Sequence, residues 1–221
     1  MVVTCAAWEF CGSPLITIRS CLPKSIRYFI TDTVLRRRVP FRLPQPVRAD
    51  VLAVYECIAE AESEVHGVPV AEIHFHEVGA LDAVADIAAC CLLLRRLAPD
   101  AVIASPVHVG SGQVRCAHGL LPVPAPATAL LLRDLPVYGG AIRGELCTPT
   151  GAALLARFAS RFDSMPAMRV RAIGIGCGKK EFEAANCLRA FLGETDDAPA
   201  DEVYEIRCNL DDCTGEDLAF A

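Results

Sequence analysis

One long helix with a single apolar face is the strongest structural signal in this chain. Its apolar side chains recur at alternating spacings of four and three residues, which places them on one side of a helix: Val47, Val51, Val54, Ile58, Ala61 and Val65. Gly67 supplies the stop for this helix, and Pro69 follows it. Because an apolar face of this length has to be buried against a second element, the sequence predicts a layered core.

Helices and strands alternate along the rest of the chain. Further helices are predicted over residues 81–97, 125–133 and 150–162, and the first of these is apolar nearly all round. Extended segments are predicted at residues 73–75, 101–109, 170–175, 187–192 and 203–210, with a rigid loop at 122–126. This alternation predicts an α/β fold, with mixed α+β layers as the alternative.

The chain divides into three parts on the same patterns. Residues 1–40 carry no sustained period and form an atypical N-terminal segment, for which order and disorder are equally compatible with the pattern. Residues 41–200 form the main domain. Residues 201–221 begin a further domain, because Thr214 and Asp217 have the spacing of a capping box that opens a helix, and only about two turns follow. We therefore expect a truncated or split protein.

Composition excludes several classes of function. The apolar fraction is 53%, but the richest apolar run, residues 83–94, is broken by Asp86, which favours a buried helix over a membrane span. The first residues lack the basic start of a secretory signal. The twelve cysteines have irregular spacings without a C-x-x-C motif, which is typical of reduced thiols in the cytoplasm. A net charge of -6 argues against a nucleic-acid partner.

The densest group of chemically active side chains is HFHEVGALDAVAD, residues 74–86. His74 and His76 point to the same side of an extended segment, and Asp82 and Asp86 share one face of the helix that follows. Two imidazoles and two carboxylates suit nickel, zinc, manganese or iron. Alternatively, Asp82 caps the helix, His74 is a satisfied core residue and Asp86 pairs with an arginine.

Three further segments indicate an anionic ligand. Residues 105–119 combine glycines with His108, Arg115, Cys116 and His118. The guanidinium of Arg115 suits the binding of a phosphate or carboxylate group. The alternatives are that residues 110–112 form only a hairpin turn and that Cys116 is a buried thiol. Residues 145–152 lead into a helix N-terminus, a typical anion site, in which Thr148 or Thr150 alternatively serves only as the cap. A glycine-rich bend at residues 174–178 is followed by Lys179 and Lys180. These two side chains suit contact with a nucleotide phosphate, and the alternative is that they are exposed to solvent.

Taken in order, the strings HFHEVGALDAVADI, SPVHVGSGQVRCAHGLLPVPAPAT, PVYGG, GELCTPTGAALL, GCGKKEFEAANCLR and NLDDCTGEDLA resemble the nickel-insertion proteins of the LarC family, from about residue 41 to 221. This resemblance implies a cytoplasmic, lyase-class nickel insertase. Its reaction is the CTP-dependent cyclometallation of pyridinium-3,5-bisthiocarboxylic acid mononucleotide, which makes the nickel pincer cofactor of lactate racemase. CTP and a divalent cation, Mn or Mg, are expected to bind through a C-terminal domain that this chain only begins.

Roles for individual residues follow from the resemblance and from the chemistry together. His74, His76, Asp82 and Asp86 are expected to hold the incoming nickel, and Glu77 or His118 to accept the proton from the ring carbon. The expected substrate-binding residues are His108, Arg115, Cys116, Thr148, Thr150, Lys179 and Lys180. The expected partners are the mononucleotide, a C-terminal fragment and further copies of the chain, with neither nucleic acid nor membrane.

Two features depart from the family pattern. Residues 1–40 lack its usual opening rich in Asp, Ser and Gly, and Cys213 stands where a methionine is usual. The competing hypotheses are a nickel carrier without catalysis, a metal-dependent phosphohydrolase and an inactive gene fragment.

Overall fold

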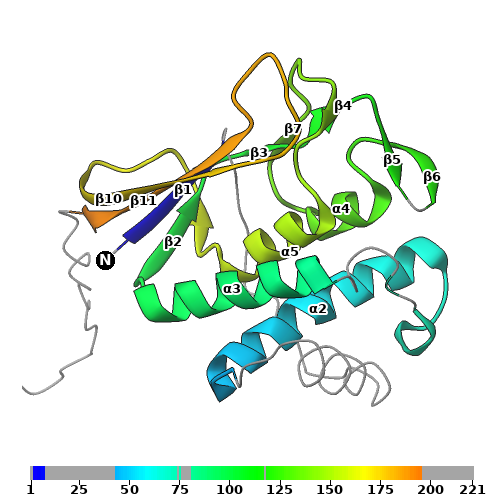
Figure 1. The fold of residues 1–221 in the computed structure, drawn as a ribbon, viewed down its shortest axis with the longest axis horizontal. Coiled ribbons are helices and arrows are strands. Elements are labelled where there is room, and N and C mark those ends of the chain that lie inside the picture. Colours follow the sequence, from blue (N-terminus) through cyan, green and yellow to red (C-terminus); the bar gives the residue numbers. More distant parts are fainter. Residues whose placement is uncertain (1, 8–42, 74, 76–80, 117, 196–221) are drawn as a thin grey trace, which may run out of the picture.

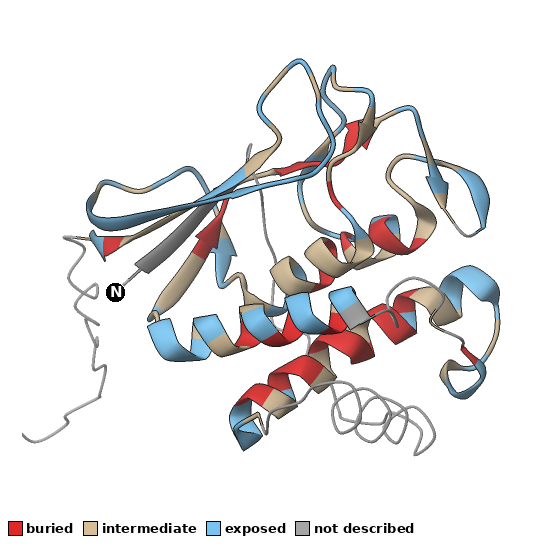
Figure 2. Cartoon of the chain, in the orientation of Figure 1, coloured by how far each residue is buried: buried red, intermediate tan, exposed pale blue. Residues whose placement is uncertain are grey.

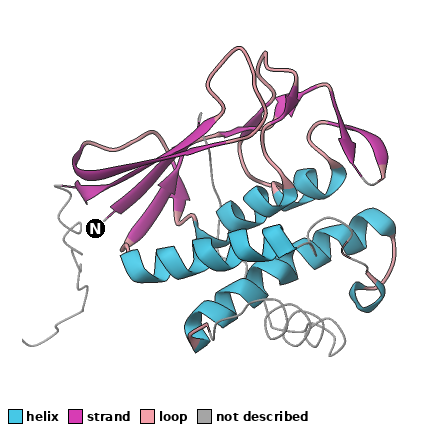
Figure 3. Cartoon of the chain, viewed as in Figure 1, coloured by secondary structure: helices cyan, strands magenta, loops and turns pink. Residues whose placement is uncertain are grey.

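The computed structural model describes residues 2–7, 43–73, 75, 81–116 and 118–195. These residues form a mixed α/β fold, in which strands lie on one side and helices on the other (Figure 1, Figure 3). The predicted fold class is therefore confirmed. The expected strand at residues 203–210 lies outside the described residues, as do residues 8–40 of the atypical segment.

The helical layer is built from α2 (Gln45–His66), α3 (Leu81–Leu97), α4 (Pro126–Leu131) and α5 (Pro149–Phe158). Helix α2 ends at Gly67, whose φ of 65° is a left-handed conformation that glycine adopts without strain. A short 3-10 turn, η2 (Val70–Glu72), follows. The predicted helices at 45–66 and 81–97 are confirmed, and α4 begins with Pro126 in its first turn as expected.

The main sheet has the strand order β10-β11-β1-β2-β9. Its strands are β10 (Met168–Cys177), β11 (Cys187–Thr195), β1 (Val2–Ala7), β2 (Ala101–Ala104) and β9 (Arg161–Phe162). The outer pairs β10–β11 and β11–β1 are antiparallel, whereas β1–β2 and β2–β9 are parallel. Strand β1 lies within residues 1–40, the segment that the sequence patterns mark as atypical. It pairs with β11 of the antiparallel part of the sheet and with β2 of the parallel part.

Three two-stranded ladders extend from the end of β2 toward the other end of the helical layer. Strand β3 (Val107–His108) pairs with β7 (Val137–Tyr138), and β4 (Gly110–Ser111) pairs with β8 (Gly144–Glu145). Strand β5 (Gln113–Cys116) forms an antiparallel hairpin with β6 (Gly119–Pro122). In Figure 1 this hairpin projects above the end of α2.

Two expected elements differ from the structure. The strand expected at 101–109 is divided into β2 and β3, because Pro106 has no N–H to continue a ladder and the chain changes partner there. The helix expected at 150–162 ends at Phe158, because the backbone N–H of Ser160 and Asp163 donate to the carbonyls of Val102 and Ala104, which builds β9 beside β2.

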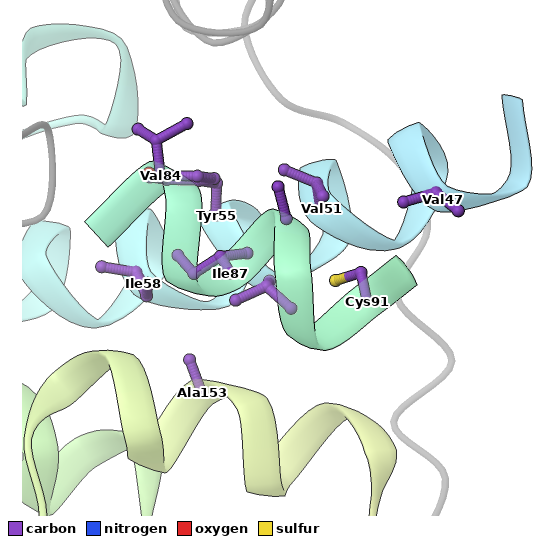
Figure 4. Close-up of a cluster of buried hydrophobic side chains, with 10 residues drawn as sticks. Val47, Val51, Tyr55, Ile58, Val84, Ile87, Cys91 and Ala153 are labelled. Carbon is purple, nitrogen blue, oxygen red and sulfur yellow. The ribbon is translucent and has the colours of Figure 1, made fainter. Parts of the chain in front are cut away.

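The main core lies between α2, α3 and α5 (Figure 2, Figure 4). Its α2 members include Val51, Val54 and Ile58, all fully buried, and these are residues of the predicted apolar face. Val84 and Ile87 meet them from α3, and Ala153 meets them from α5 (Figure 4). A second cluster under the small ladders contains Ala104, Val107, Val109, Leu132, Cys147 and Ala152.

Asp50 is a buried carboxylate that joins the three core helices. Its side chain is only 2% exposed. The Nε and Nη2 atoms of Arg95 on α3 donate to it at 2.5 and 3.0 Å, and Nη2 of Arg157 on α5 donates at 3.2 Å. The buried charge is thus compensated from two helices, as burial requires.

Candidate functional site

A cavity of about 780 Å³ lies where the ends of several elements meet: α2, α3, α4, α5, the β5–β6 hairpin and the bend after β10. This volume is in the range of cavities that enclose ligands of drug or nucleotide size. Charged and polar side chains make up much of its lining: Glu62, His66, Asp82, Asp86, Arg115, Cys116, His118, Glu145, Thr148, Thr150 and Lys180.

Helix α3 supplies an acidic wall to this cavity. Asp82 and Asp86 are one turn apart, and both are exposed toward it. Burial, and secondly the Asp82 carboxylate, raises the pKa of Tyr55. Burial, and secondly Asp86, raises the pKa of Cys90, which lines the same wall. In both cases burial is the larger cause, and the nearby carboxylate adds to it by disfavouring a second negative charge.

The capping alternative for Asp82 is supported in part. Its Oδ1 accepts a hydrogen bond from the backbone N–H of Ala83 at 2.9 Å. That bond occupies one carboxylate oxygen at the first turn of α3, where a negative charge is also favoured by the helix dipole. Asp82 and Asp86 both line the cavity.

The β5–β6 hairpin also lines the cavity. Arg115 and Cys116 lie at the end of β5, and His118 lies in the turn. Arg115 and His118 are exposed, and Cys116 is half-buried. The alternative of a hairpin turn at 110–112 is wrong. Gly112, with a φ of 84°, forms a bend between β4 and β5, which do not pair with each other: β4 pairs with β8, and β5 pairs with β6.

The start of α5 and the bend after β10 close the remaining side. The Oγ1 of Thr148 accepts a hydrogen bond from the N–H of Gly151 at 3.3 Å, so Thr148 caps this helix. Thr150 lies in the first turn and lines the cavity. Nζ of Lys180 lies 3.9 Å from Oε2 of Glu145, a weak ion pair on the cavity rim. Lys179 is exposed and does not line the cavity.

His108 lies away from the cavity and is buried. Its ring stacks on Tyr138, with 4.5 Å between the ring centroids and an interplanar angle of 12°. Its Nε2 is 3.1 Å from the carbonyl oxygen of Gly139. A side chain at Gly140 would overlap this ring, so the histidine is packed tightly against the β7 segment.

The structure thus brings together eight of the predicted site residues around one cavity: Asp82, Asp86, Arg115, Cys116, His118, Thr148, Thr150 and Lys180. His74, His76 and Glu77 lie outside the described residues. Within the described part of the chain, no three His, Cys, Asp or Glu side chains converge as a ready metal site.

Sequence reasoning missed four polar residues that line the cavity: Glu62, His66, Cys90 and Glu145. Glu62 and His66 lie on the last turn of α2, where Oε2 and Nε2 are 3.3 Å apart. Their spacing of four residues was a usable signal, because it places both on one helix face just before the stop at Gly67. The prediction for this helix rested on its apolar face alone and therefore did not include these two polar residues.

The described residues form an α/β protein with a polar cavity, lined by two carboxylates of α3 and by an arginine and a histidine of the β5–β6 hairpin. The family model described as nickel insertion protein matches residues 33–221. The chain therefore belongs to the nickel insertion protein family, and the predicted resemblance is confirmed.

Three curated relatives illustrate the similarity, and each is named pyridinium-3,5-bisthiocarboxylic acid mononucleotide nickel insertion protein. The relative from Nocardioides is 49% identical over 171 residues, which are 77% of this chain and 43% of the relative. The relative from Desulfitobacterium hafniense is 41% identical over 79% of this chain and 45% of its own length. The relative from Staphylococcus saprophyticus is 39% identical over 80% of this chain and 46% of its own length.

This chain spans about half the length of the curated relatives it matches. No solved structure matches it. Within the residues that the structure describes, no helix is both long enough and apolar enough to cross a bilayer.

Proposed function

We propose that this chain forms the nickel- and substrate-binding part of an enzyme that inserts nickel into pyridinium-3,5-bisthiocarboxylic acid mononucleotide. The observation that carries the proposal is the cavity itself, which Asp82 and Asp86 line together with Arg115 and His118. We further propose that the reaction is a CTP-dependent cyclometallation of the lyase class, which takes place in the cytoplasm and serves the maturation of lactate racemase.

The proposed substrates match the two kinds of charge on this cavity. Nickel is a cation, and the carboxylates of Asp82 and Asp86 supply negative charge along α3. The mononucleotide carries a phosphate and two thiocarboxylates, which are anions. Arg115 can bind such a group with two parallel N–H donors, and the first turn of α5 at Thr150 adds backbone donors.

The proposed reaction replaces a hydrogen on the ring carbon with nickel. Ni²⁺ forms one bond to that carbon and two bonds to the thiocarboxylate sulfurs, while the C–H bond breaks and its electron pair remains on carbon. The proton passes to a base, and no electron is exchanged with an external reagent. We propose Glu77 or His118 as this base, because His118 lines the cavity and histidine is the side chain that most often transfers protons in catalysis.

His74 and His76 complete the proposed nickel ligands with Asp82 and Asp86. The supporting argument is the spacing in the chain, since both histidines precede the helix that bears the two carboxylates. CTP and its Mn or Mg ion are proposed to bind a C-terminal part of the enzyme, as the family resemblance implies.

A reconstitution experiment tests the proposal. The chain is incubated with Ni²⁺, CTP and the bisthiocarboxylate, with and without a co-expressed C-terminal part, and the product is analysed for bound nickel by mass spectrometry. We expect nickel-containing product only when both parts are present, and at least a tenfold loss with Asp86→Asn or Arg115→Ala. Equal product from either variant and the unchanged chain would refute the assignment of this cavity.

A carrier without catalysis is the competing function. It predicts that nickel binds the chain with the same dependence on Asp86, whereas no carbon–nickel product forms with any C-terminal part. The same incubation therefore separates the two functions.

A further inference from the structure

We propose that Cys177 and Cys187 form a reversible disulfide, whose closure fixes the loop of residues 178–186 and with it Lys180 at the rim of the cavity. Cys177 ends β10 and Cys187 begins β11, so the two thiols lie at the base of this loop. The disulfide and its effect on the loop do not depend on the proposed function, because neither involves nickel or the mononucleotide.

The sheet register places the two cysteines directly opposite each other. In the antiparallel ladder between β10 and β11, Cys177 is the partner of Cys187. Opposed residues of a ladder put their side chains on the same face of the sheet. Among the strand pairings of the described residues, no other two cysteines are in register. The fold therefore singles out this pair.

The hydrogen bonds around the pair define the kind of ladder position that it occupies. The N–H of Gly178 donates to the carbonyl oxygen of Asn186 at 2.9 Å, one step beyond the cysteines. The N–H of Cys187 donates to the carbonyl oxygen of Ala185 at 3.1 Å, within its own segment. Both bonds are those of a non-hydrogen-bonded position for Cys177 and Cys187, where opposed side chains approach most closely.

This position meets the geometric requirement of a disulfide. Opposed Cα atoms at a non-hydrogen-bonded position are about 4.5 Å apart. A disulfide needs Cα atoms about 4.4–6.8 Å apart and Cβ atoms about 3.5–4.5 Å apart. The paired strands already supply the Cα separation, so the bond closes by rotation of the two thiols without a change of register.

The pair is also accessible to small reagents. Cys177 is exposed and Cys187 is half-buried. Cys91 and Cys147, in contrast, are buried, and burial above all raises the pKa of each of these two thiols to about 12. Thiol–disulfide exchange begins with an accessible thiolate. We therefore expect Cys177 to react first and Cys187 to resolve the product.

The proposed reaction is exchange with a low-molecular-weight disulfide, such as oxidised glutathione. The thiolate of Cys177 attacks one sulfur of that disulfide, whose S–S bond breaks and releases one thiolate. The thiolate of Cys187 then attacks the Cys177 sulfur of the mixed disulfide and releases the second thiolate. Two protein thiols are oxidised, their two protons pass to the released thiolates, and one external disulfide is reduced. In a reducing pool the pair stays open.

The loop between the cysteines reaches the cavity. Nδ2 of Asn186 donates to the carbonyl oxygen of Lys180 at 2.9 Å, and Nζ of Lys180 lies 3.9 Å from Oε2 of Glu145 at the rim. The ring of Phe182 lies against Gly144, where an added Cβ would be 2.8 Å from it. A covalent bond at the base of the loop prevents separation of the strand ends, so these contacts are kept for more of the time.

The alternative is that the two cysteines are neighbours that react independently. In that case each thiol takes up its own glutathione, and the two adducts accumulate without a bond between the strands. The two possibilities give products of different mass.

Mass spectrometry of the full chain tests the bond. The reduced chain is incubated with oxidised glutathione, the remaining thiols are blocked, and trypsin cuts after Arg171, Lys179, Lys180 and Arg189. A disulfide then joins the peptide of residues 172–179 to that of residues 181–189. We expect this linked pair to be the main product of oxidation at Cys177.

Serine variants supply the matched controls. Cys187→Ser should stop the reaction at the mixed disulfide of Cys177 with glutathione. Cys116→Ser, which removes a half-buried thiol on another strand, should leave the yield of the linked pair unchanged. Loss of the linked pair in both variants would contradict the assignment.

Hydrogen exchange tests the effect on the loop, again without nickel or substrate. We expect the backbone amides of residues 178–186 to exchange at least about threefold more slowly in the disulfide form, with the β5–β6 hairpin unchanged. Dithiothreitol should restore the faster rate.

Two results would overturn the proposal. One is separate glutathione adducts on Cys177 and Cys187 without the linked peptides, and the other is a linked pair with no change of exchange in the loop. In either case nickel insertion itself stands if the reduced chain still yields nickel-containing product. A linked pair and a slowed loop in a chain that yields no such product support the disulfide and count only against the proposed function.

Discussion

The carboxylate of Asp50 is expected to be a main determinant of stability, and Asp50→Asn is the variant that tests it. This substitution keeps the size of the side chain and removes its charge. Three hydrogen bonds from Arg95 and Arg157 to a 2% exposed carboxylate are then replaced by weaker or mismatched ones. The amide also brings N–H donors to a site where the arginines are themselves only donors.

The expected cost can be bounded from the exposure of the partners. Breaking a fully buried ion pair costs about 3–5 kcal/mol. Here Arg95 and Arg157 are 52% and 39% exposed and regain water, which lowers the cost. We therefore expect Asp50→Asn to reduce the free energy of unfolding by about 2–3 kcal/mol.

Glu64→Gln is the matched control, because it makes the same chemical change in a pair on the surface. Nη2 of Arg133 lies 2.5 Å from Oε1 of Glu64, and the two side chains are 58% and 56% exposed. Its expected cost is below about 1 kcal/mol. Urea unfolding followed by circular dichroism compares the two variants. Equal costs for Asp50→Asn and Glu64→Gln would show that burial of the carboxylate is not what makes the pair strong.

Two further predictions concern other parts of the fold. Gly140→Ala should destabilise the chain by about 2–4 kcal/mol, because the new methyl group meets the ring of His108 at a φ of 60°. Gly112→Ala should cost only about 1 kcal/mol in the same urea unfolding assay, since its φ is 84° with open space around it, and equal costs would argue against the clash. Burial, and secondly Glu145, raises the pKa of Cys147 to about 12, so little of this thiol is ionised at pH 8. Iodoacetamide reacts with the thiolate, so it should modify the exposed Cys177 much faster than Cys147. Peptide mass spectrometry measures both rates, and comparable rates in the folded chain would contradict this.

The helical part of the fold was predictable because its signals are local. The apolar face from Val47 to Val65 and the stop at Gly67 set the bounds of α2 without reference to any other segment. The nearly all-apolar residues 81–97 likewise form α3, with its inward side against α2. Side chains on such helices repeat every turn, so a single sequence contains the pattern.

Strand partners were less predictable, because pairing depends on residues far apart in the chain. Strand β1 pairs with β11 on one side and β2 on the other, and its six residues have no distinctive local period. The end of α5 was misplaced for the same reason. The composition of Arg161 and Phe162 is compatible with a helix. However, the backbone N–H groups of Ser160 and Asp163 donate hydrogen bonds to Val102 and Ala104, which makes Arg161 and Phe162 a strand beside β2.

The site was predictable as a set of motifs rather than as a geometry. Asp82, Asp86, Arg115 and Thr150 were singled out on separate segments, and the structure shows that these segments surround one cavity. His66 was missed because its signal, a polar pair on the last turn of an otherwise apolar helix, gains meaning only when the β5–β6 hairpin brings His118 beside it.

The link between Asp50, Arg95 and Arg157 sits far from the cavity along the helices. Asp50 is in the second turn of α2, whereas Glu62 and His66 are at its other end, about 18 and 24 Å away at 1.5 Å per residue. Arg95 and Arg157 are likewise near the C-terminal ends of α3 and α5, whose opposite ends line the cavity. The ion pairs of Asp50 therefore join the three helices at one end, and the main core packs them together toward the cavity. A tilt of α2 by about five degrees about Asp50 moves Glu62 and His66 by about 1.6 and 2.1 Å, so Asp50→Asn should lower ion affinity at the cavity even where the chain still folds.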